Sequence, residues 1–186
     1  MLVEIGHFAL VLALLVALVQ AVVPLAGAAV RNAALMALAR PAALAQFGLV
    51  ALSFAIFVDA HIGSDFSVRN VYENSSLAKP MLYKVTGAWG SHEGSMMLWV
   101  FMLALFGGLV ALFGEALPVR LKARALAVQG LLGFGTLLFI IATSNPFERL
   151  LPAPADGHGL NPLLQDPGLA FPPPCLYFGY VGFSIT

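Results

Sequence analysis

Residues 5–23 read IGHFALVLALLVALVQAVV, an apolar stretch of 19 residues without a charged side chain. An α-helix rises about 1.5 Å per residue, so roughly 20 residues cross the hydrocarbon layer of a bilayer, which is about 30 Å thick. We therefore predict a membrane-spanning helix that is closed by Pro24. A cleaved signal peptide is the alternative, because the small residues at 26–29 resemble a cleavage site. The first four residues carry no positive charge and the apolar run is long, which favours a retained helix.

Three further apolar stretches of spanning length follow, at residues 42–58, 95–113 and 125–143. A fifth begins at Pro174 and reaches about half a span at the last residue, so we expect it either to lie in the membrane interface or to belong to a longer protein. Hydrophobic residues make up 60% of the chain and charged residues 10%, whereas soluble domains carry about 25% charged residues. The sequence predicts an all-α, polytopic membrane helix bundle with four spans plus a truncated fifth, in a single membrane domain (1–186).

The basic residues predict how the chain is oriented in the membrane. The short connection after the first span holds Arg31 and Arg40 and no acid, and the one after the third span holds three basic residues against Glu115. Two longer loops, residues 59–94 and 144–173, mix both signs. Because short loops rich in Lys and Arg stay in the cytoplasm, we expect the N-terminus and both long loops to be periplasmic, in a multi-pass protein of a bacterial inner membrane. Nine basic and nine acidic residues leave no net charge to attract nucleic acid.

The second half of the first long loop holds the candidate binding residues. Trp89, His92 and Glu93 lie just before the third span, and a helix that begins near Ser91 would place His92 and Glu93 in its first turn, where a carboxylate is stabilised by the helix dipole. One interpretation is structural: an interfacial tryptophan, a helix cap and a hydrogen-bonded histidine. The other is a platform at the membrane surface for a flat, amphipathic ligand, with aromatic faces and one potential iron ligand.

The other polar residues give weaker signals. His61 and His158 are expected to be loop histidines without partners at metal spacing, and His7 is either a hydrogen-bonded residue at the membrane edge or a haem ligand or proton relay. Cys175 is the only cysteine and cannot form an intramolecular disulfide. No zinc-protease, phosphate-loop, paired-cysteine or catalytic-triad motif is present in the sequence.

Three segments resemble those of the haem lyase subunit of the bacterial cytochrome c maturation system, the F-type cytochrome c biogenesis proteins. They are DFSV at 65–68 with NSS at 74–76, WGSHEGSMMLW at 89–99, and LNPLLQDPG at 160–168 with PPCLYFGYVG at 173–182. The resemblance implies cytochrome c-type biogenesis, in which haem is the cofactor handled and is transferred to apocytochrome c. It implies a haem chaperone, apocytochrome c and other maturation subunits as partners, beside membrane lipid.

The resemblance also suggests a haem-facing surface of Trp89, His92, Glu93 and Tyr177. It places the family's first outer histidine, an axial ligand of iron, at the position of Pro172, and proline has no imidazole to bind a metal. The family's tryptophan-rich haem-holding signature is expected beyond residue 186. On this interpretation the chain is a component of a haem lyase and is not catalytic alone.

The alternative functions are a non-catalytic membrane scaffold, and a transporter or respiratory-complex subunit. A transporter is expected to carry ionisable or helix-breaking residues in mid-span. The spans here are nearly free of charge, and the only expected breaks are the glycines of the third and fourth spans, Gly107, Gly108, Gly130, Gly133 and Gly135. This pattern favours chemistry on the outer surface.

Overall fold

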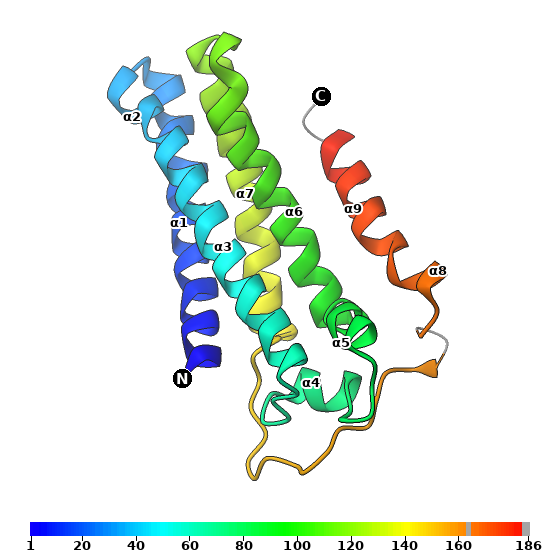
Figure 1. The fold of residues 1–186 in the computed structure, drawn as a ribbon. Helices are drawn as coiled ribbons and strands as arrows, with labels where there is room; N and C mark the ends of the chain where they lie inside the picture. Colours follow the sequence, from blue (N-terminus) through cyan, green and yellow to red (C-terminus); the bar gives the residue numbers. More distant parts are fainter. Residues whose placement is uncertain (163–164, 184–186) are drawn as a thin grey trace.

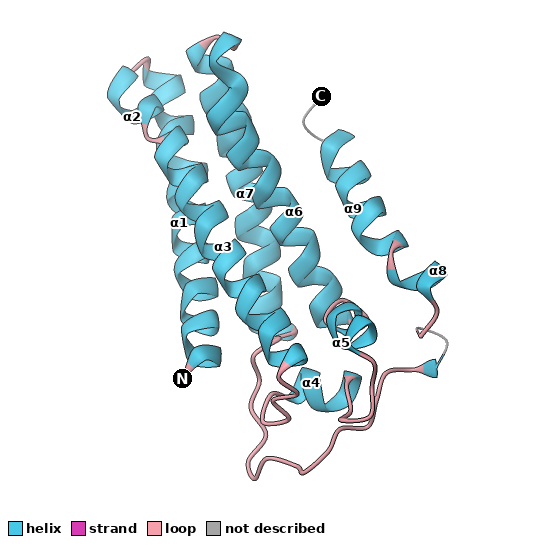
Figure 2. Cartoon of the chain, viewed as in Figure 1, coloured by secondary structure: helices cyan, strands magenta, loops and turns pink. Residues whose placement is uncertain are grey.

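Four long helices form a bundle, as the apolar stretches predict (Figure 1). They are α1 (Leu2–Val30), α3 (Ala39–Ile62), α6 (His92–Phe113) and α7 (Val119–Thr143). The structure is a computed structural model that describes residues 1–162 and 165–183, and these residues form helices and loops without a named strand (Figure 2). Each long helix is apolar enough to cross a membrane. The predicted four spans are confirmed.

Small residues let the helices approach one another. Helix α1 packs against both α3 and α7, and α6 packs against α3 and α7. The buried face of α1 carries an alanine every four residues, at Ala9, Ala13, Ala17 and Ala21. In lipid there is no hydrophobic force between helices, so close backbone contact of this kind provides the van der Waals attraction that holds a bundle together. Large apolar side chains such as Leu15 and Leu131 are exposed on the outside, where lipid chains would cover them.

Helix α1 does not end at Pro24, so the predicted end of the first span is wrong. Pro24 is buried inside the helix, which continues to Val30 and ends at Arg31 in the left-handed conformation, with φ of 58°. Proline removes one backbone donor, but neighbouring helices let membrane helices tolerate it. The helix of the fourth span also differs from the prediction, because it begins at Val119 rather than near residue 125.

The glycines of α6 and α7 do not break their helices either, so that expectation is also wrong. Three of them receive glutamine side chains from neighbouring helices. A Cβ atom on Gly107 would overlap Gln129, one on Gly133 would overlap the amide of Gln46, and one on Gly130 would lie 2.9 Å from Cγ of Gln20. The glutamine amides also bond across the bundle, as in Nε2 of Gln20, which donates to the carbonyl oxygen of Leu126 at 2.8 Å. The glycines therefore make room for polar contacts between helices.

The two ends of the bundle differ. At one end, here called the short-turn end, the connections are α2 (Ala33–Ala37) and the 3-10 helix η1 (Gly114–Ala116). The other end, here called the loop end, carries the N-terminus and both long loops (Figure 1). The first of these loops contains α4 (Arg69–Asn74) and α5 (Met81–Gly87). The basic connections thus lie opposite the two long loops.

The fifth apolar stretch forms a helix that runs along the side of the bundle. After α8 (Pro167–Ala170), helix α9 (Pro172–Phe183) starts at the loop end and follows α6 (Figure 1). Aromatic rings join the two helices: Trp99 and Tyr177 have centroids 5.4 Å apart, and Phe106 and Phe178 have centroids 4.9 Å apart. Because these contacts are spaced along α6, α9 does not lie flat at the surface. Leu163 and Leu164 of the third motif segment, and residues 184–186 of the apolar stretch, lie outside the described residues.

Candidate functional site

The start of α6 is a hydrogen-bonded turn, as the sequence predicts. Ser91 is the N-cap, and its side chain accepts a hydrogen bond from the backbone N–H of Gly94 at 3.0 Å. The hydroxyl of Ser95 donates to the carbonyl oxygen of Trp89 at 2.8 Å. Glu93 lies in the first turn, where the positive end of the helix dipole favours its charge. Residues 89–95 therefore hold a fixed shape at the membrane border.

Asn70 of α4 connects the first motif segment to this turn. Its side-chain amide donates to Oγ of Ser91 at 2.8 Å and to Oε2 of Glu93 at 3.2 Å. Asn70 is only 4% exposed, so its hydrogen bonds compete little with water. Sequence reasoning did not single out Asn70, because nothing in the sequence places α4 beside the start of α6.

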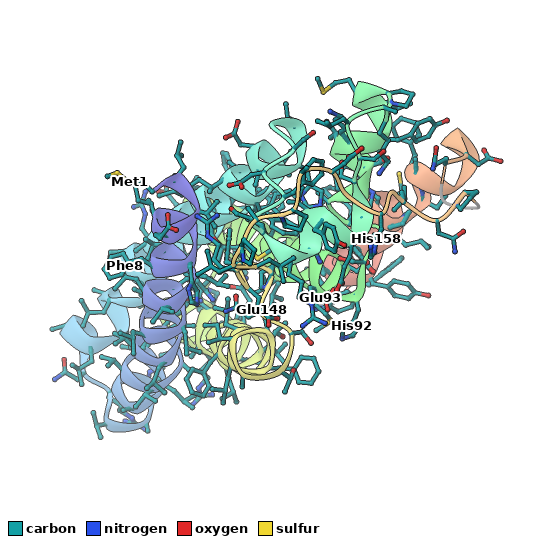
Figure 3. The ribbon with its side chains drawn as sticks, turned by 90° about the horizontal axis from the view of Figure 1, so that it is seen from below. Met1, Phe8, His92, Glu93, Glu148 and His158 are labelled. Atoms are coloured by element: carbon teal, nitrogen blue, oxygen red, sulfur yellow. The ribbon has the colours of Figure 1, made fainter. Side chains whose placement is uncertain are left out.

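A polar pocket of about 230 Å³ opens next to this connection. The guanidinium group of Arg69 bonds to Glu73 at 2.9 Å and to Glu148 at 3.2 Å. These two carboxylates raise the pKa of Arg69, with the hydrogen bond to Glu73 as the larger cause. Figure 3 shows the loop end from below, with Glu93 and Glu148 at this place. The lining residues come from α4, α6, the end of α7 and the second long loop: Arg69, Asn70, Glu73, Glu93, Thr143, Ser144, Asn145 and Glu148.

The third motif segment and the residues beside it contact the regions of the other two. The carbonyl oxygen of Ala170 accepts a hydrogen bond from Nε1 of Trp89 at 3.0 Å. Leu160 packs so closely on Gly90 that a Cβ atom there would lie 2.8 Å from the leucine methyl group. The ring nitrogen of His158 bonds to the hydroxyl of Tyr72 at 2.7 Å. The three segments, which are far apart in the sequence, are thus joined at one end of the bundle.

The four predicted haem-facing residues do not share one face. Trp89 points toward α8, and Tyr177 of α9 stands edge-on to Trp99. Glu93 points into the polar pocket, and the exposed ring of His92 stands edge-on to Phe139 of α7, with centroids 6.3 Å apart. Trp89 therefore lies on the side of α8 and α9, to which Tyr177 belongs. His92 and Glu93 lie on the side of α7. A smaller pocket of about 190 Å³ adjoins Trp89 and reaches Pro173.

Two further histidines, His61 and His7, lie in the long helices α3 and α1. His61 is not a loop residue as expected: it lies in the last turn of α3, is fully buried, and bonds through Nδ1 to the carbonyl oxygen of Phe57 at 3.1 Å. His7 stacks on Phe147 and lies 3.4 Å from the amide of Asn145. Of the histidines, which all fall within the described residues, His92 alone combines an exposed ring with no hydrogen bond, so it is the residue best placed to bind a metal from outside.

Pro172 is the first residue of α9 and is half-buried. Among the residues that the structure describes, no three histidine, cysteine, aspartate or glutamate side chains lie close enough to hold a metal ion. The loop end therefore offers an aromatic surface, a polar pocket and one free imidazole, without a complete set of metal ligands.

Among the described residues of the loop end, Lys79 is the one buried lysine or arginine. Its ammonium group donates to the carbonyl oxygen of Asn74 at 2.7 Å, and the residue is 7% exposed. Burial lowers the pKa of Lys79 to about 8, and the positive charge of Lys84 adds to the effect. Lys79 therefore helps to fix the end of α4 and gives up its proton more readily than a surface lysine.

Replacing Asn70 with leucine should destabilise the loop end. The change keeps the branched shape of the side chain but leaves the Glu93 carboxylate without its buried donor, which costs about 1–3 kcal/mol. The midpoint of thermal unfolding in detergent measures the effect. The matched control is Glu73→Gln on the same helix, which weakens an exposed ion pair of the kind worth about 0–1 kcal/mol. Equal midpoints for the two variants would show that the Asn70 bonds add no stability.

Comparisons with known proteins identify relatives of the whole chain. The family model described as "Cytochrome C assembly protein" matches residues 89–186. The cytochrome c-type biogenesis protein ccl1 of Rhodobacter capsulatus is 64% identical over the whole chain, CycK of Bradyrhizobium diazoefficiens is 60% identical over the whole chain, and CcmF of Escherichia coli is 48% identical over 98% of it. The chain spans 28% of the length of each of these relatives. A solved structure, "Cytochrome c Heme Lyase CcmF", matches the fold of the whole chain with a TM-score of 0.86 at 22% identity, over 29% of that protein's length.

Proposed function

Because the chain belongs to the cytochrome c assembly protein family, we propose that it works in cytochrome c-type biogenesis, as part of a membrane-embedded haem lyase. Haem is then the group that is handled, and apocytochrome c is the acceptor to which it is attached. The relatives are named for cytochrome c biogenesis, which supports this assignment. The chain spans 28% of their length, so its own contribution is one part of the activity.

The convergence of the three motif segments at the loop end carries the proposal. Leu160 packs on Gly90 and Tyr177 packs on Trp99, so the second and third segments are in contact. Asn70, which lies between the two parts of the first segment, bonds to the turn of residues 89–95. We call the two long loops together, residues 59–94 and 144–173, the loop-end platform. A flat, amphipathic molecule such as haem needs an apolar surface beside the membrane with polar groups at its edge. Trp89 of the platform and Tyr177 of the adjoining α9 offer aromatic surface, and the polar pocket of the platform offers polar groups.

The platform would hold iron only weakly by itself. His92 is exposed and is our candidate for one contact with iron, while Pro172 occupies the position at which the family resemblance expects a histidine. Low-spin haem with two histidine ligands would need a second imidazole besides that of His92, and Pro172 cannot provide it. We propose that this chain positions haem and its partners, which include a haem chaperone and apocytochrome c, rather than completing the lyase reaction alone.

Deleting the gene tests the proposed function. In the organism that encodes the chain, c-type cytochromes should lose their covalently bound haem, which haem staining of denaturing gels detects. Cytochromes of the b type hold haem without covalent bonds, so their absorbance should persist and serves as the internal control. A plasmid copy of the gene should restore the stain. Unchanged covalent haem in the deletion strain would refute the proposal.

The loop end is proposed to face the periplasm of a bacterial inner membrane, where c-type cytochromes receive haem. Support comes from the basic residues at the opposite end, Arg31 and Arg40 in one connection and Arg120, Lys122 and Arg124 in the other. Alkaline phosphatase, which is active only in the periplasm, should be active when fused after Glu73 and inactive when fused after Lys122. The reverse pattern would invert the topology and move the platform to the cytoplasm.

A further inference from the structure

Helix α7 has an outward ridge between two apolar grooves in the half of the bundle near the short-turn end. One groove, of about 270 Å³, lies between α6 and α7 and includes Leu103, Val110 and Leu132. The other, of about 390 Å³, lies between α1 and α7 and includes Val22, Leu25 and Leu131. Val128 lines both grooves and is 54% exposed, so it forms the ridge that separates them. Two parallel apolar grooves on either side of one ridge match the two acyl chains of a phospholipid.

Arg124 lies on the same outward face of α7, one turn closer to the short-turn end than Val128. It lines the groove between α6 and α7, is exposed, and precedes Val128 by four residues, which places both on one face of the helix. Within the described parts of the chain, Arg124 forms no ion pair with an acidic side chain. It also lies near the N-terminus of α7, where the helix dipole is unfavourable for a cation. An anion from outside the chain would compensate this charge.

The depth of Arg124 suits a lipid phosphate. From Arg124 to Thr143, the last residue of α7, the helix rises about 28 Å at 1.5 Å per residue, close to the roughly 30 Å of the hydrocarbon layer. If Thr143 lies at one border of this layer, Arg124 lies at the other, where phosphate groups are found. The apolar grooves then extend from this border into the hydrocarbon.

We propose that this face of α7 binds one anionic diacyl phospholipid, with its phosphate on Arg124 and one acyl chain in each groove. The charge of the short-turn end selects the head group. Its two connections and the first turns of α7 hold five basic residues against one acidic residue, Glu115, so an ammonium group on a zwitterionic lipid would be repelled. Basic pockets between membrane helices bind anionic lipids on the same principle. This site is separate from the platform and does not depend on the proposed function.

The full chain in detergent is mixed with phosphatidylglycerol, or with phosphatidylcholine that has the same acyl chains. Native mass spectrometry then measures the fraction of protein that retains one lipid. Phosphatidylglycerol should be retained in preference. Arg124→Gln should weaken its binding about fivefold, the effect expected for one basic residue near a membrane surface. Arg31→Gln removes the same charge at the same end without touching either groove, and its binding should match the unaltered chain.

A second variant tests the grooves without changing any charge. Ala26 is exposed and lines the groove between α1 and α7, so Ala26→Phe fills that groove from outside the helix contact. It should also weaken retention of phosphatidylglycerol. Size-exclusion chromatography checks that each variant is folded. Equal retention of both lipids would refute the site, because no charge preference would remain. Equal losses for Arg31→Gln and Arg124→Gln would also refute it, because they would indicate a diffuse charge effect. Retention of another protein in place of the lipid would assign the grooves to a partner helix.

Discussion

Replacing Gly94 with alanine should prevent α6 from starting where it does. A Cβ atom at this position would overlap the carbonyl oxygen of Ala88 and lie 2.8 Å from its carbonyl carbon. Both are backbone atoms of the preceding turn, so neither can rotate away. The added methyl group would also lie 3.1 Å from Oγ of Ser91, which caps the helix. We expect a loss of about 4 kcal/mol or more in the free energy of unfolding, the range of the most severe single substitutions. The amount of protein in the membrane and its thermal midpoint in detergent measure this loss.

Gly48→Ala in α3 and Gly135→Ala in α7 are the matched controls. Neither position has another atom within 4 Å of an added Cβ, so alanine should be neutral or should stabilise the helix by about 1 kcal/mol through its higher helix propensity. A Gly94→Ala protein with normal abundance and midpoint would mean that the turn is not closed as described. The conformation of Gly94 itself does not require glycine, because its φ is not positive. The close approach to the backbone of Ala88 is the cause.

The second large effect is expected for Gly130→Leu, which should separate α1 from α7. A Cβ atom on Gly130 would already lie 3.0 Å from the backbone nitrogen of Ala21 and 2.9 Å from Cγ of Gln20. The remaining atoms of leucine would have to displace α1, and Gln20 would lose its bond to the carbonyl oxygen of Leu126. Overpacking of a core costs about 1–3 kcal/mol and occasionally more, and we expect this variant near or above the upper value.

Gly135→Leu is the control for this prediction, since it places the same side chain five residues further along the same helix. Gly135 is exposed and has no atom within 4 Å of an added Cβ, so leucine should point into lipid. Resistance to unfolding by sodium dodecyl sulfate should fall for Gly130→Leu and stay unchanged for Gly135→Leu. Similar resistance for both variants would show that α1 and α7 do not touch at Gly130.

The sequence predicted the features that depend on neighbours along the chain. Hydropathy is a local property, so the four spans were found, and capping chemistry is local too, so the start of α6 near Ser91 was found. The end of α1 was misplaced at Pro24, because proline in a membrane helix is tolerated only when other helices surround it. Whether other helices surround Pro24 depends on how the bundle packs, and the local sequence does not show this.

The candidate site was only partly predictable for the same reason. Trp89 and Glu93 were recognised as special, but the sequence could not tell that they point to different sides of α6. Asn70 was missed because its importance arises from two contacts with a helix more than twenty residues away. The glutamines of the spans were missed as well, since the glycines that receive them lie on other helices. One signal could have revealed these glutamine–glycine pairs. It is a polar residue such as Gln20 within an apolar span, considered together with the glycines of other spans.

The bonds between the two long loops also set an order of events during synthesis. Arg69 and its partner Glu148 are 79 positions apart, and Trp89 and its partner Ala170 are 81 positions apart. A ribosome that adds about 5–20 residues per second needs roughly 4–16 s to make the later residue of each pair. During these seconds the first long loop has been made, but its polar contacts with the second long loop are still missing. The platform is therefore completed only after the fourth span has been made. Until then the side chains of Trp89 and Arg69 lack their partners in the second long loop and are open to other molecules.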